Sequence, residues 1–415
     1  MSQTFLDTTW VSLKVLRLLL NKLIVAEYFN RSWEKEFHKE FAPGSQITVK
    51  FPQRFTVTNG MSYTPQGINR LQTPVNLDQW MQVAFEWDDY ENAVKLERSE
   101  AELQEQYFEP AAAALAQECD SRCAKFAYQN TSMTVGVLGT DPTTVATYYT
   151  ARQRLEENAA GVLGKRCALV SSSMMTSLGT NITTIFNPAS EIEKSWKEGV
   201  IGQLGGAMFY ESQSLYSHTA GTWAAAVTVN GANQSGNTLT ITATAGDTFN
   251  VGDKFSVANV NLVNPMTRRI PGKAAAKVFT ITTALTAAGG GVDVITFLPP
   301  IYGPTGTNSQ YQNVDALPAN SAALTLWPGT ASPNGKVGTV GLELTRQAFA
   351  IVGAKLFVPN STESAGTAQD PDTGLSVRKV KAWDPVRSVQ VNRMDSLFGL
   401  GNLYQDNGAV AIAGA

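Results

Sequence analysis

The longest helical pattern of apolar residues in this chain lies between Ser99 and Asn130. Its apolar positions recur at steps of four and three, which places them on one face of a helix. They are Phe108, Ala112, Leu115, Cys119, Cys123 and Phe126. Ser99 and Glu102 fit a capping box, and Pro110 predicts a kink or a helix start at its position. A helix from Pro110 to Gln129 is about 30 Å long, and its single apolar stripe predicts packing on one side only.

Before this helix, the pattern predicts a first helix and then a hairpin. Trp10–Phe29 is apolar but interrupted by charges, so it predicts an amphipathic helix and neither a membrane span nor a signal peptide. The interrupting residues are Lys14, Arg17, Lys22 and Glu27. Alternating apolar residues over 47–57 and over 83–87 predict two strands. The tip of this hairpin is expected at Gly60–Pro74, where glycine and proline break the pattern.

The first helix and the hairpin have no evident core of their own. A lone hairpin is marginally stable in water, and no third strand is adjacent to it in the sequence. We therefore expect neighbouring copies of the same chain to bury residues 1–90.

Beyond the long helix, helices and strands alternate, as is typical of a compact α/β region. Asp141 and Pro142 predict the cap and first residue of a helix that ends near Asn158. The elements expected next are a buried strand at Cys167–Val170, a short helix capped by Ser171–Ser173, a helix at Glu191–Glu198 and a strand over 202–215.

The composition changes near Trp223. From there to Pro328 the chain is rich in Thr, Val, Gly, Ala and Asn and poor in charge. Four strands separated by turn residues are predicted, at Thr238–Thr242, Lys254–Val257, Lys277–Thr282 and Val292–Phe297. We expect a small β-barrel or sandwich inserted into the α/β region, which resumes at Val337 and ends in a strand-rich tail.

Charge and cysteine content limit which partners and which roles for the cysteines can be expected. The chain has 32 basic and 35 acidic residues, for a net charge of −3. This balance argues against strong non-specific binding to nucleic acid or to anionic membranes. The three cysteines are expected as reduced thiols. Cys119 and Cys123 share a helix face with Cβ atoms about 5–6 Å apart, farther than a disulfide prefers, so packing in the core is the favoured role.

Residue patterns that carry enzyme chemistry are absent from the sequence. The two histidines, His38 and His218, lie far apart, and no Cys or His group has zinc-ligand spacing. The glycine-rich stretches 161–165 and 329–336 miss the phosphate-loop spacing, and no Gly-x-Ser-x-Gly elbow occurs. We therefore predict a protein that is not an enzyme, with no catalytic, cofactor or metal site.

Charged residues of the hairpin and of the predicted insert are candidates for contacts between subunits. They are Lys50, Arg54, Arg70, Asp88, Asp89, Arg268, Arg269 and Lys273. The last three, with Lys277, form a basic cluster around Pro271-Gly272. A solvated loop or a contact to an acidic neighbour is favoured over nucleic acid for this cluster, because no aromatic residues interleave with it.

The order of these elements resembles the major capsid (coat) proteins of tailed bacteriophages. The branch that it is most similar to is the coat protein of the short-tailed Salmonella phage type, which carries an insertion domain. The resemblance is carried by 12–37 followed by 43–57 (PGSQITVKFPQRFTV), 199–221 (GVIGQLGGAMFYESQSLYSHTAG), 252–282, 344–356 (LTRQAFAIVGAKL) and 375–399.

The resemblance implies an α+β protein with the Hong-Kong-97-type capsid fold and an inserted β-barrel-like domain. Five segments are expected: an N-terminal arm (1–45), an extended hairpin loop (46–90), the spine helix with the first part of the peripheral and axial α/β domains (91–222), the inserted β-rich domain (223–330) and the return (331–415). The hairpin loop would reach over a neighbouring subunit.

The function implied is that of a major capsid protein which self-assembles into the icosahedral head shell around double-stranded phage DNA. Its partners would be copies of itself in hexamers and pentamers, a scaffolding protein and a portal during assembly, and weakly bound DNA, with no membrane. It would belong to the virion and assemble in the bacterial cytoplasm. Two alternatives stay open: an encapsulin-like nanocompartment shell, and a β-rich carbohydrate-binding or decoration protein.

Overall fold

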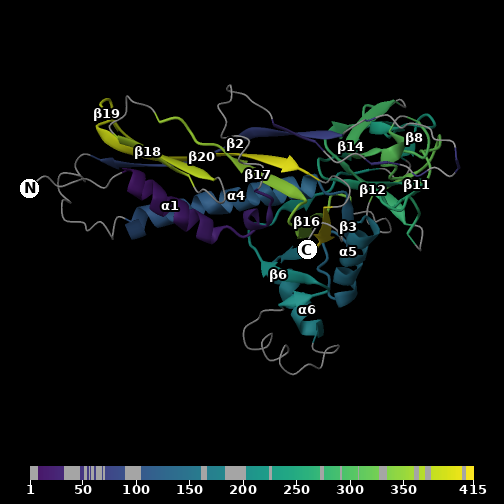
Figure 1. The fold of residues 1–415 in the computed structure, drawn as a ribbon, viewed down its shortest axis with the longest axis horizontal. Helices are drawn as coiled ribbons and strands as arrows, with labels where there is room; N and C mark the ends of the chain where they lie inside the picture. The colour runs from purple at the N-terminus through teal and green to yellow at the C-terminus, as the bar shows by residue number, and fades with distance from the viewer. Residues whose placement is uncertain are drawn as a thin grey trace, which may run out of the picture. The chain divides into compact units, whose positions relative to one another are not determined.

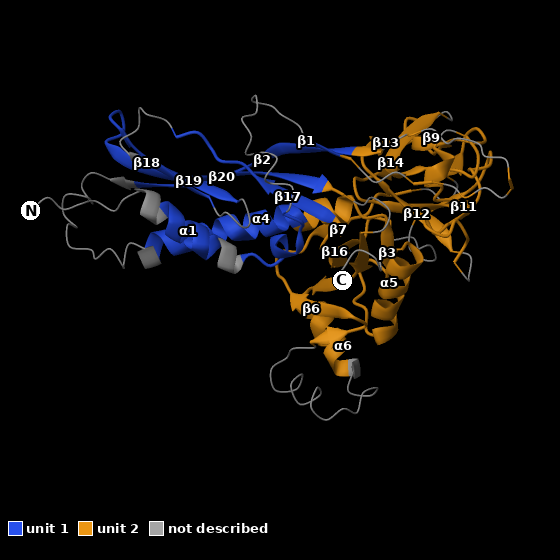
Figure 2. Cartoon of the chain, viewed as in Figure 1, with its two compact units in different colours: residues 1–49, 73–123, 349–401 blue, residues 50–72, 124–348, 402–415 orange. Residues whose placement is uncertain are grey.

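The computed structural model describes most of the chain. The described residues are 8–31, 47–50, 54–55, 57, 60–61, 68, 71–88, 104–159, 166–182, 202–223, 227–271, 275–289, 292–306, 308–326, 334–358, 364–369, 375–403 and 408–415. The chain forms two compact units (Figure 2). Unit 1 comprises 1–49, 73–123 and 349–401, and unit 2 comprises 50–72, 124–348 and 402–415.

Unit 1 contains a sheet that joins the hairpin to the C-terminal part of the chain (Figure 1). Its strand order is β1 (Ile47–Lys50), β2 (Gln72–Asp88), β20 (Val389–Asn402), β19 (Ser376–Asp384) and β18 (Ser364–Gln369), and β17 (Phe349–Gly353) also pairs with β20. Strands β2 and β20 are antiparallel from Asn76 opposite Leu400 to Asp88 opposite Val389. The hairpin strand β2 therefore has its third strand within the same chain.

The first helix also packs within unit 1. Helix α1 (Thr8–Lys22) contacts β18 and β19, and Val15, Leu16 and Leu19 are buried. After the 3₁₀ turn η1 (Ala26–Tyr28), Asn30 N–H donates to Phe349 O at 2.7 Å. The expectation that residues 1–90 have no core in their own chain is thus wrong for the described part. The missing partners are strands some 300 positions away, which no local pattern reveals.

Two boundaries of this region also differ from the prediction. Helix α1 ends at Lys22, whereas the apolar pattern extends to Phe29. Strand β2 begins at Gln72 and includes Pro74, and β1 ends at Lys50, before the predicted end of the first strand at Val57. Proline is tolerated there because the register with β20 begins only at Asn76.

The long helix is confirmed. Helix α4 (Glu109–Gln129) follows directly on a π-helical turn, η3 (Gln104–Phe108). Pro110 is the second residue of α4, where the π-helical turn passes into the α-helix, so the lack of an N–H on proline removes no hydrogen bond within α4 itself. The predicted face is buried, with Phe126 half-buried, and Cys119 and Cys123 are buried thiols. The capping box at Ser99 and Glu102 lies outside the described residues.

The α/β part of unit 2 is built on a mixed sheet. Its order is β3 (Met133–Val135), β21 (Ala409–Ala413), β16 (Val337–Thr345), β4 (Arg166–Val170), β6 (Ala207–Glu211) and β5 (Gln203–Leu204), and β7 (Ser217–Thr219) also pairs with β16. Helices α5 (Val145–Glu157) and α6 (Ser172–Ile182) contribute to a core with Val170, Phe209 and Ile412.

Local predictions in this part had mixed outcomes. The strand at β4 and the Ser171 cap of α6 are confirmed, since Met174 N–H donates to Ser171 Oγ at 3.2 Å. The cap at Asp141 is wrong, because α5 begins at Val145 after Thr144. The single strand predicted over 202–215 is the hairpin β5–β6, whose turn residues Gly205 and Gly206 both have positive φ. Glu191–Glu198 lies outside the described residues.

The β-rich region predicted from Trp223 to Pro328 forms an antiparallel sheet in unit 2. Its order is β15 (Leu324–Leu326), β11 (Lys254–Asn261), β12 (Ala276–Ile281), β14 (Asp293–Ile301), β9 (Gly236–Thr242) and β8 (Thr228–Val229), with β10 (Thr248–Phe249) paired to β13 (Leu285–Thr286). Phe255, Phe279 and Phe297 pack edge to face or tilted in its core. All four predicted strands are present. Among the described helices, none is both long and apolar enough to cross a membrane.

Candidate functional site

The structure describes five of the eight predicted contact residues. Lys50 is the last residue of β1 and is exposed. Asp88 is the last residue of β2, opposite Val389. Three candidates lie outside the described residues, namely Arg70, Asp89 and Lys273.

Arg54 of the hairpin segment and Arg268 of the insert lie close together in unit 2. The Arg54 guanidinium is 5.8 Å from the ring centroid of Tyr311, in the 3₁₀ turn η5 (Ser309–Tyr311). Arg268 donates a 2.7 Å hydrogen bond from Nη2 to Gln310 O. Burial lowers the pKa of Arg268, and the charge of Arg54 lowers it further. Two predicted contact residues therefore have partners inside their own subunit.

The basic cluster of the insert is smaller than its sequence suggests. Arg269 is exposed, in a loop where its carbonyl accepts a hydrogen bond from Asn264 N–H at 3.0 Å. Lys277 is only 2% exposed, because it points inward from β12. The prediction that Lys277 belongs to a solvated cluster is wrong, because the alternation of β12 decides its direction.

Large apolar side chains are exposed along the hairpin segment. They are Phe55, Val57, Met61 and Ile68. Val57 and Met61 are 96% and fully exposed, respectively, so neither has a covering partner among the described residues of this chain. Burying such side chains stabilises an interface by about 1.5–3 kcal/mol each.

A second candidate site lies where the chain enters and leaves the insert. Strand β7 pairs with β16 from Ser217 opposite Thr339 to Thr219 opposite Val337. Ala220 N–H donates to Lys336 O at 2.9 Å, and the Asn334 side chain bonds the carbonyl of Trp223 at 3.0 Å. We call these two paired connections, 217–223 and 334–339, the neck.

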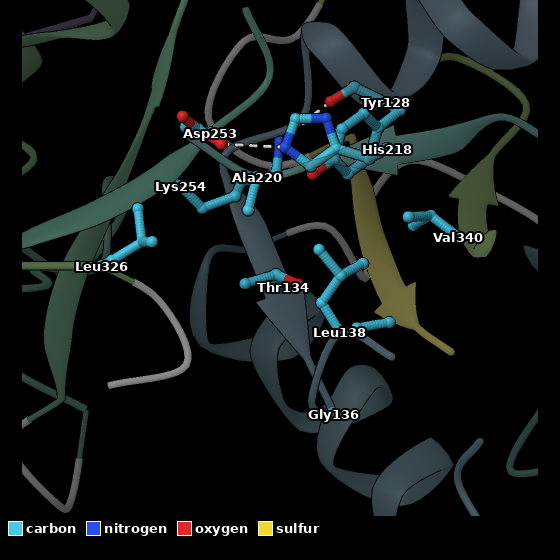
Figure 3. A pocket seen from close by; sticks show the side chains of 11 residues that line it. Tyr128, Thr134, Gly136, Leu138, His218, Ala220, Asp253, Lys254, Leu326 and Val340 are labelled. Atoms are coloured by element: carbon cyan, nitrogen blue, oxygen red, sulfur yellow. Dashed lines mark hydrogen bonds and ion pairs between the residues drawn. The ribbon is translucent and has the colours of Figure 1, made fainter. Parts of the chain in front are cut away.

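Beside the neck is a small cavity, between the mixed sheet and the inserted sheet (Figure 3). The mixed sheet and the loop after β3 contribute apolar or small residues, such as Leu138 and Val340. The polar residues come from the insert (Asp253 and Lys254), the end of α4 (Tyr128), β7 (His218) and β3 (Thr134). The lining residues are Tyr128, Thr134, Gly136, Leu138, His218, Ala220, Asp253, Lys254, Leu326, Val340 and Ala413.

Lys254 is the central cation of this site and is 5% exposed. Its Nζ donates to Tyr128 O at 2.9 Å, to Thr280 Oγ1 at 3.0 Å and to Thr131 O. It also lies 4.3 Å from the Tyr128 ring centroid. Burial lowers the pKa of Lys254 well below its usual value, and nearby Asp253 opposes this shift. Three acceptors surround Nζ, one for each proton that an ammonium group can donate.

Asp253 joins the neck to the insert. His218 Nε2 and Asp253 Oδ1 are 2.9 Å apart (Figure 3). The same carboxylate accepts from Gly221 N–H at 3.1 Å and from Asn250 N–H at 2.7 Å. Burial raises the pKa of Tyr128 well above its usual value, with the charge of Asp253 as a further cause.

This arrangement supports positioning, because the polar groups of Asp253 and Lys254 are already bonded within unit 2. The ammonium and carboxylate groups are used in hydrogen bonds to backbone groups of the same unit. In the part of the chain that the structure describes, no cluster of His, Cys, Asp or Glu could hold a metal ion.

Sequence reasoning did not find this site. The sequence predicts Lys254 only as the first residue of a strand, and Asp253-Lys254 resembles an ordinary solvated strand end. Two of the three acceptors of Lys254 lie more than 120 positions earlier in the chain, so local patterns carry no signal for them.

Comparison with known proteins gives one family match. The family model described as "P22 coat protein - gene protein 5" matches residues 14–405. No curated protein sequence matches the chain. Three similar solved structures are from phages. The structure of Mycobacterium phage Che8 is 14% identical, with a TM-score of 0.48, over 95% of this chain and 92% of the other. The capsid of Cyanophage P-SCSP1u is 12% identical, with a TM-score of 0.42, over 90% of this chain and 84% of the other. The capsid of Ralstonia phage GP4 is 8% identical, with a TM-score of 0.41, over 89% of this chain and 83% of the other.

Proposed function

Because this chain belongs to the P22 coat protein family, it is a major capsid protein that forms a head shell, and we propose that hexamers and pentamers of it enclose double-stranded phage DNA. A scaffolding protein and a portal take part in assembly, which occurs in the bacterial cytoplasm, and the product is the shell of the virion. The role is mechanical, with no enzymatic step and no cofactor.

The observation that carries this proposal is the exposed apolar set on the hairpin segment, Phe55, Val57, Met61 and Ile68. Four large apolar side chains on one connecting segment are costly in a monomer and favour burial on a neighbour. In the proposed shell this segment reaches over an adjacent subunit, while Lys50 and Arg269 are exposed charges available for contacts at the rim of that interface.

The charge balance fits a wall that holds DNA without binding it tightly. With a net charge of −3, the chain has no excess of cations to neutralise phosphates. We also propose that the five segments 1–45, 46–90, 91–222, 223–330 and 331–415 act as arm, hairpin loop, spine with α/β domains, insert and return.

The test replaces exposed apolar residues by a charge. In the double variant Val57→Asp/Met61→Asp, we expect monomer stability to be unchanged and closed shells to be lost in electron micrographs. Val292→Asp is the matched control, since Val292 is 72% exposed on the insert. Normal shells from the double variant, or equal loss from the control, would contradict the role of the hairpin.

The contents of purified shells distinguish the phage shell from a cellular nanocompartment. Shells from infected or induced cells should contain double-stranded DNA once filled and a scaffolding protein before that. A co-purified cargo enzyme in place of both would contradict the proposal.

A further inference from the structure

We propose that the insert is positioned by capping the C-terminal ends of helices α4 and α5, and that Lys254 is the positioning residue at α4. The proposal concerns unit 2 alone. It rests on contacts from two separate places on the insert to two helix ends.

The first contact is at the end of α4. Tyr128 is the last residue but one of this helix, and its carbonyl accepts from Lys254 Nζ at 2.9 Å. Thr131 O, just beyond the helix, accepts from Lys254 Nζ and from Thr280 Oγ1, the latter at 2.7 Å. Strands β11 and β12 of the insert thus reach the end of α4 through one ammonium and one hydroxyl group.

The second contact is at the end of α5. Asn264 Nδ2 donates to the carbonyl of Glu157, the last residue of that helix, at 2.8 Å. The Asn264 side chain is held in place, because its Oδ1 accepts from Met266 N–H at 2.9 Å and from Thr267 N–H at 3.1 Å.

Both contacts have the same physical basis. The last carbonyls of a helix lack helical partners, and the helix dipole makes that end favourable for a cation or a donor. A cation buried in an apolar core costs free energy unless its protons are donated. Lys254 has an acceptor for each of its three protons, whereas an ordinary core position on β11 would carry an apolar side chain.

The neck explains why such contacts matter. Its two connections run side by side and are paired through β7 and β16. They therefore act as a single attachment between the insert and the mixed sheet. The contacts at α4 and α5 come from two further places on the insert, so together with the neck they limit its rotation. In a shell protein, the direction of the insert decides which surfaces meet neighbouring subunits, so these contacts position it for assembly.

The test is Lys254→Met in the full-length chain, which removes the ammonium and keeps an unbranched side chain. We expect amide hydrogen exchange to become at least tenfold faster over 128–134, with no change in β9 and β14, and the yield of closed shells to fall severalfold. Lys277→Met is the matched control, since Lys277 is a buried lysine on the next strand; its exchange over 128–134 should stay as in the wild type.

Three results would overturn the proposal. One is unchanged exchange over 128–134 in Lys254→Met. Another is uniform acceleration throughout the insert, which would mean that Lys254 supports the fold of the insert and not its position. The third is faster exchange over 128–134 together with a normal yield of shells.

Thr280→Val keeps the test decisive if Lys254→Met does not fold. It removes the hydroxyl that bridges Lys254 and Thr131 while preserving the shape of the side chain. We expect a smaller acceleration over the same residues. No acceleration in this variant would count against the proposal in the same way.

Discussion

The Asp120 carboxylate on helix α4 accepts a 2.7 Å hydrogen bond from the backbone N–H of Ile24. Its other oxygen accepts from Ala26 N–H at 2.9 Å. Burial raises the pKa of Asp120, while hydrogen bonds from Ile24, Ala26 and Val25 act in the opposite direction. One side chain of the spine helix thus holds three successive amides just after α1, entirely within unit 1.

Removing this carboxylate should loosen the N-terminal segment. Asp120→Ala leaves buried N–H groups without an acceptor, at about 1–3 kcal/mol for each such group, so we expect a loss of about 3 kcal/mol. Asp120→Asn retains one acceptor oxygen and should lose less. Urea unfolding measures both, with Asp78→Asn, an exposed carboxylate of the same unit, as the control. Equal midpoints for Asp120→Ala and the wild type would refute this.

Glu343 should make the stability of unit 2 fall as pH rises. It is 3% exposed on β16, and burial raises its pKa to about 7, against the opposing charges of Arg166 and Arg152. Between about pH 4.5 and 7 the unfolded chain is ionised at this residue and the folded chain is not, so the folded state binds more protons. Stability is therefore lost as pH rises through this window, by about 3 kcal/mol in all.

Glu343→Gln tests this dependence. The variant cannot ionise, so at pH 8 it should be more stable than the wild type by up to the same amount, and the two should converge near pH 4.5. Thermal unfolding from pH 4 to 8 is the measurement. Glu27→Gln, which changes an exposed carboxyl, should follow the wild-type profile. Parallel profiles for Glu343→Gln and the wild type would exclude the effect.

Lys379 should have the opposite dependence at alkaline pH. Its Nζ lies 4.5 Å from the ring centroid of Phe108, and burial, with Lys381 as a second cause, lowers its pKa to about 8. Between pH 8 and about 10.5 the unfolded chain binds more protons at this residue, so stability rises with pH. At pH 7 both states are protonated and the cost of burying the cation is fully present.

Lys379→Met should therefore stabilise unit 1 at pH 7. The gain is about 2 kcal/mol, once a cation–π contribution of about 1 kcal/mol is subtracted from the burial cost, and it should shrink toward pH 10.5. Lys355→Met, at an exposed position, serves as the control. Destabilisation at pH 7 would show that the contact with Phe108 outweighs the cost of burial.

Two glycines should respond to alanine with opposite signs. A Cβ at Gly221 in the neck would meet the Thr248 carbonyl oxygen and the Asp253 carboxylate, whereas at Gly179 in α6 it would meet nothing within 4 Å. We expect Gly221→Ala to cost about 1–3 kcal/mol and Gly179→Ala to gain about 1 kcal/mol through helix propensity. Calorimetry measures the change in unfolding free energy for each variant. Changes of the same sign in both would contradict the packing at the neck.

The sequence by itself determined the elements whose causes are local. The steps of four and three in α4 and the Ser171 cap act within a few residues, and so do the alternating strands of the insert. Each of these was predicted close to where it lies. The order of the elements along the chain is sufficient to suggest a coat protein.

Only the tertiary structure decided which distant segments are partners. β2 pairs with β20, Arg54 lies near Arg268, and Lys254 reaches the end of α4. Alternation states which side of a strand is apolar, but not which strand lies beside it. For a charged residue such as Lys254, burial becomes favourable only after the fold has brought its acceptors together, because an unpaired buried cation is unstable.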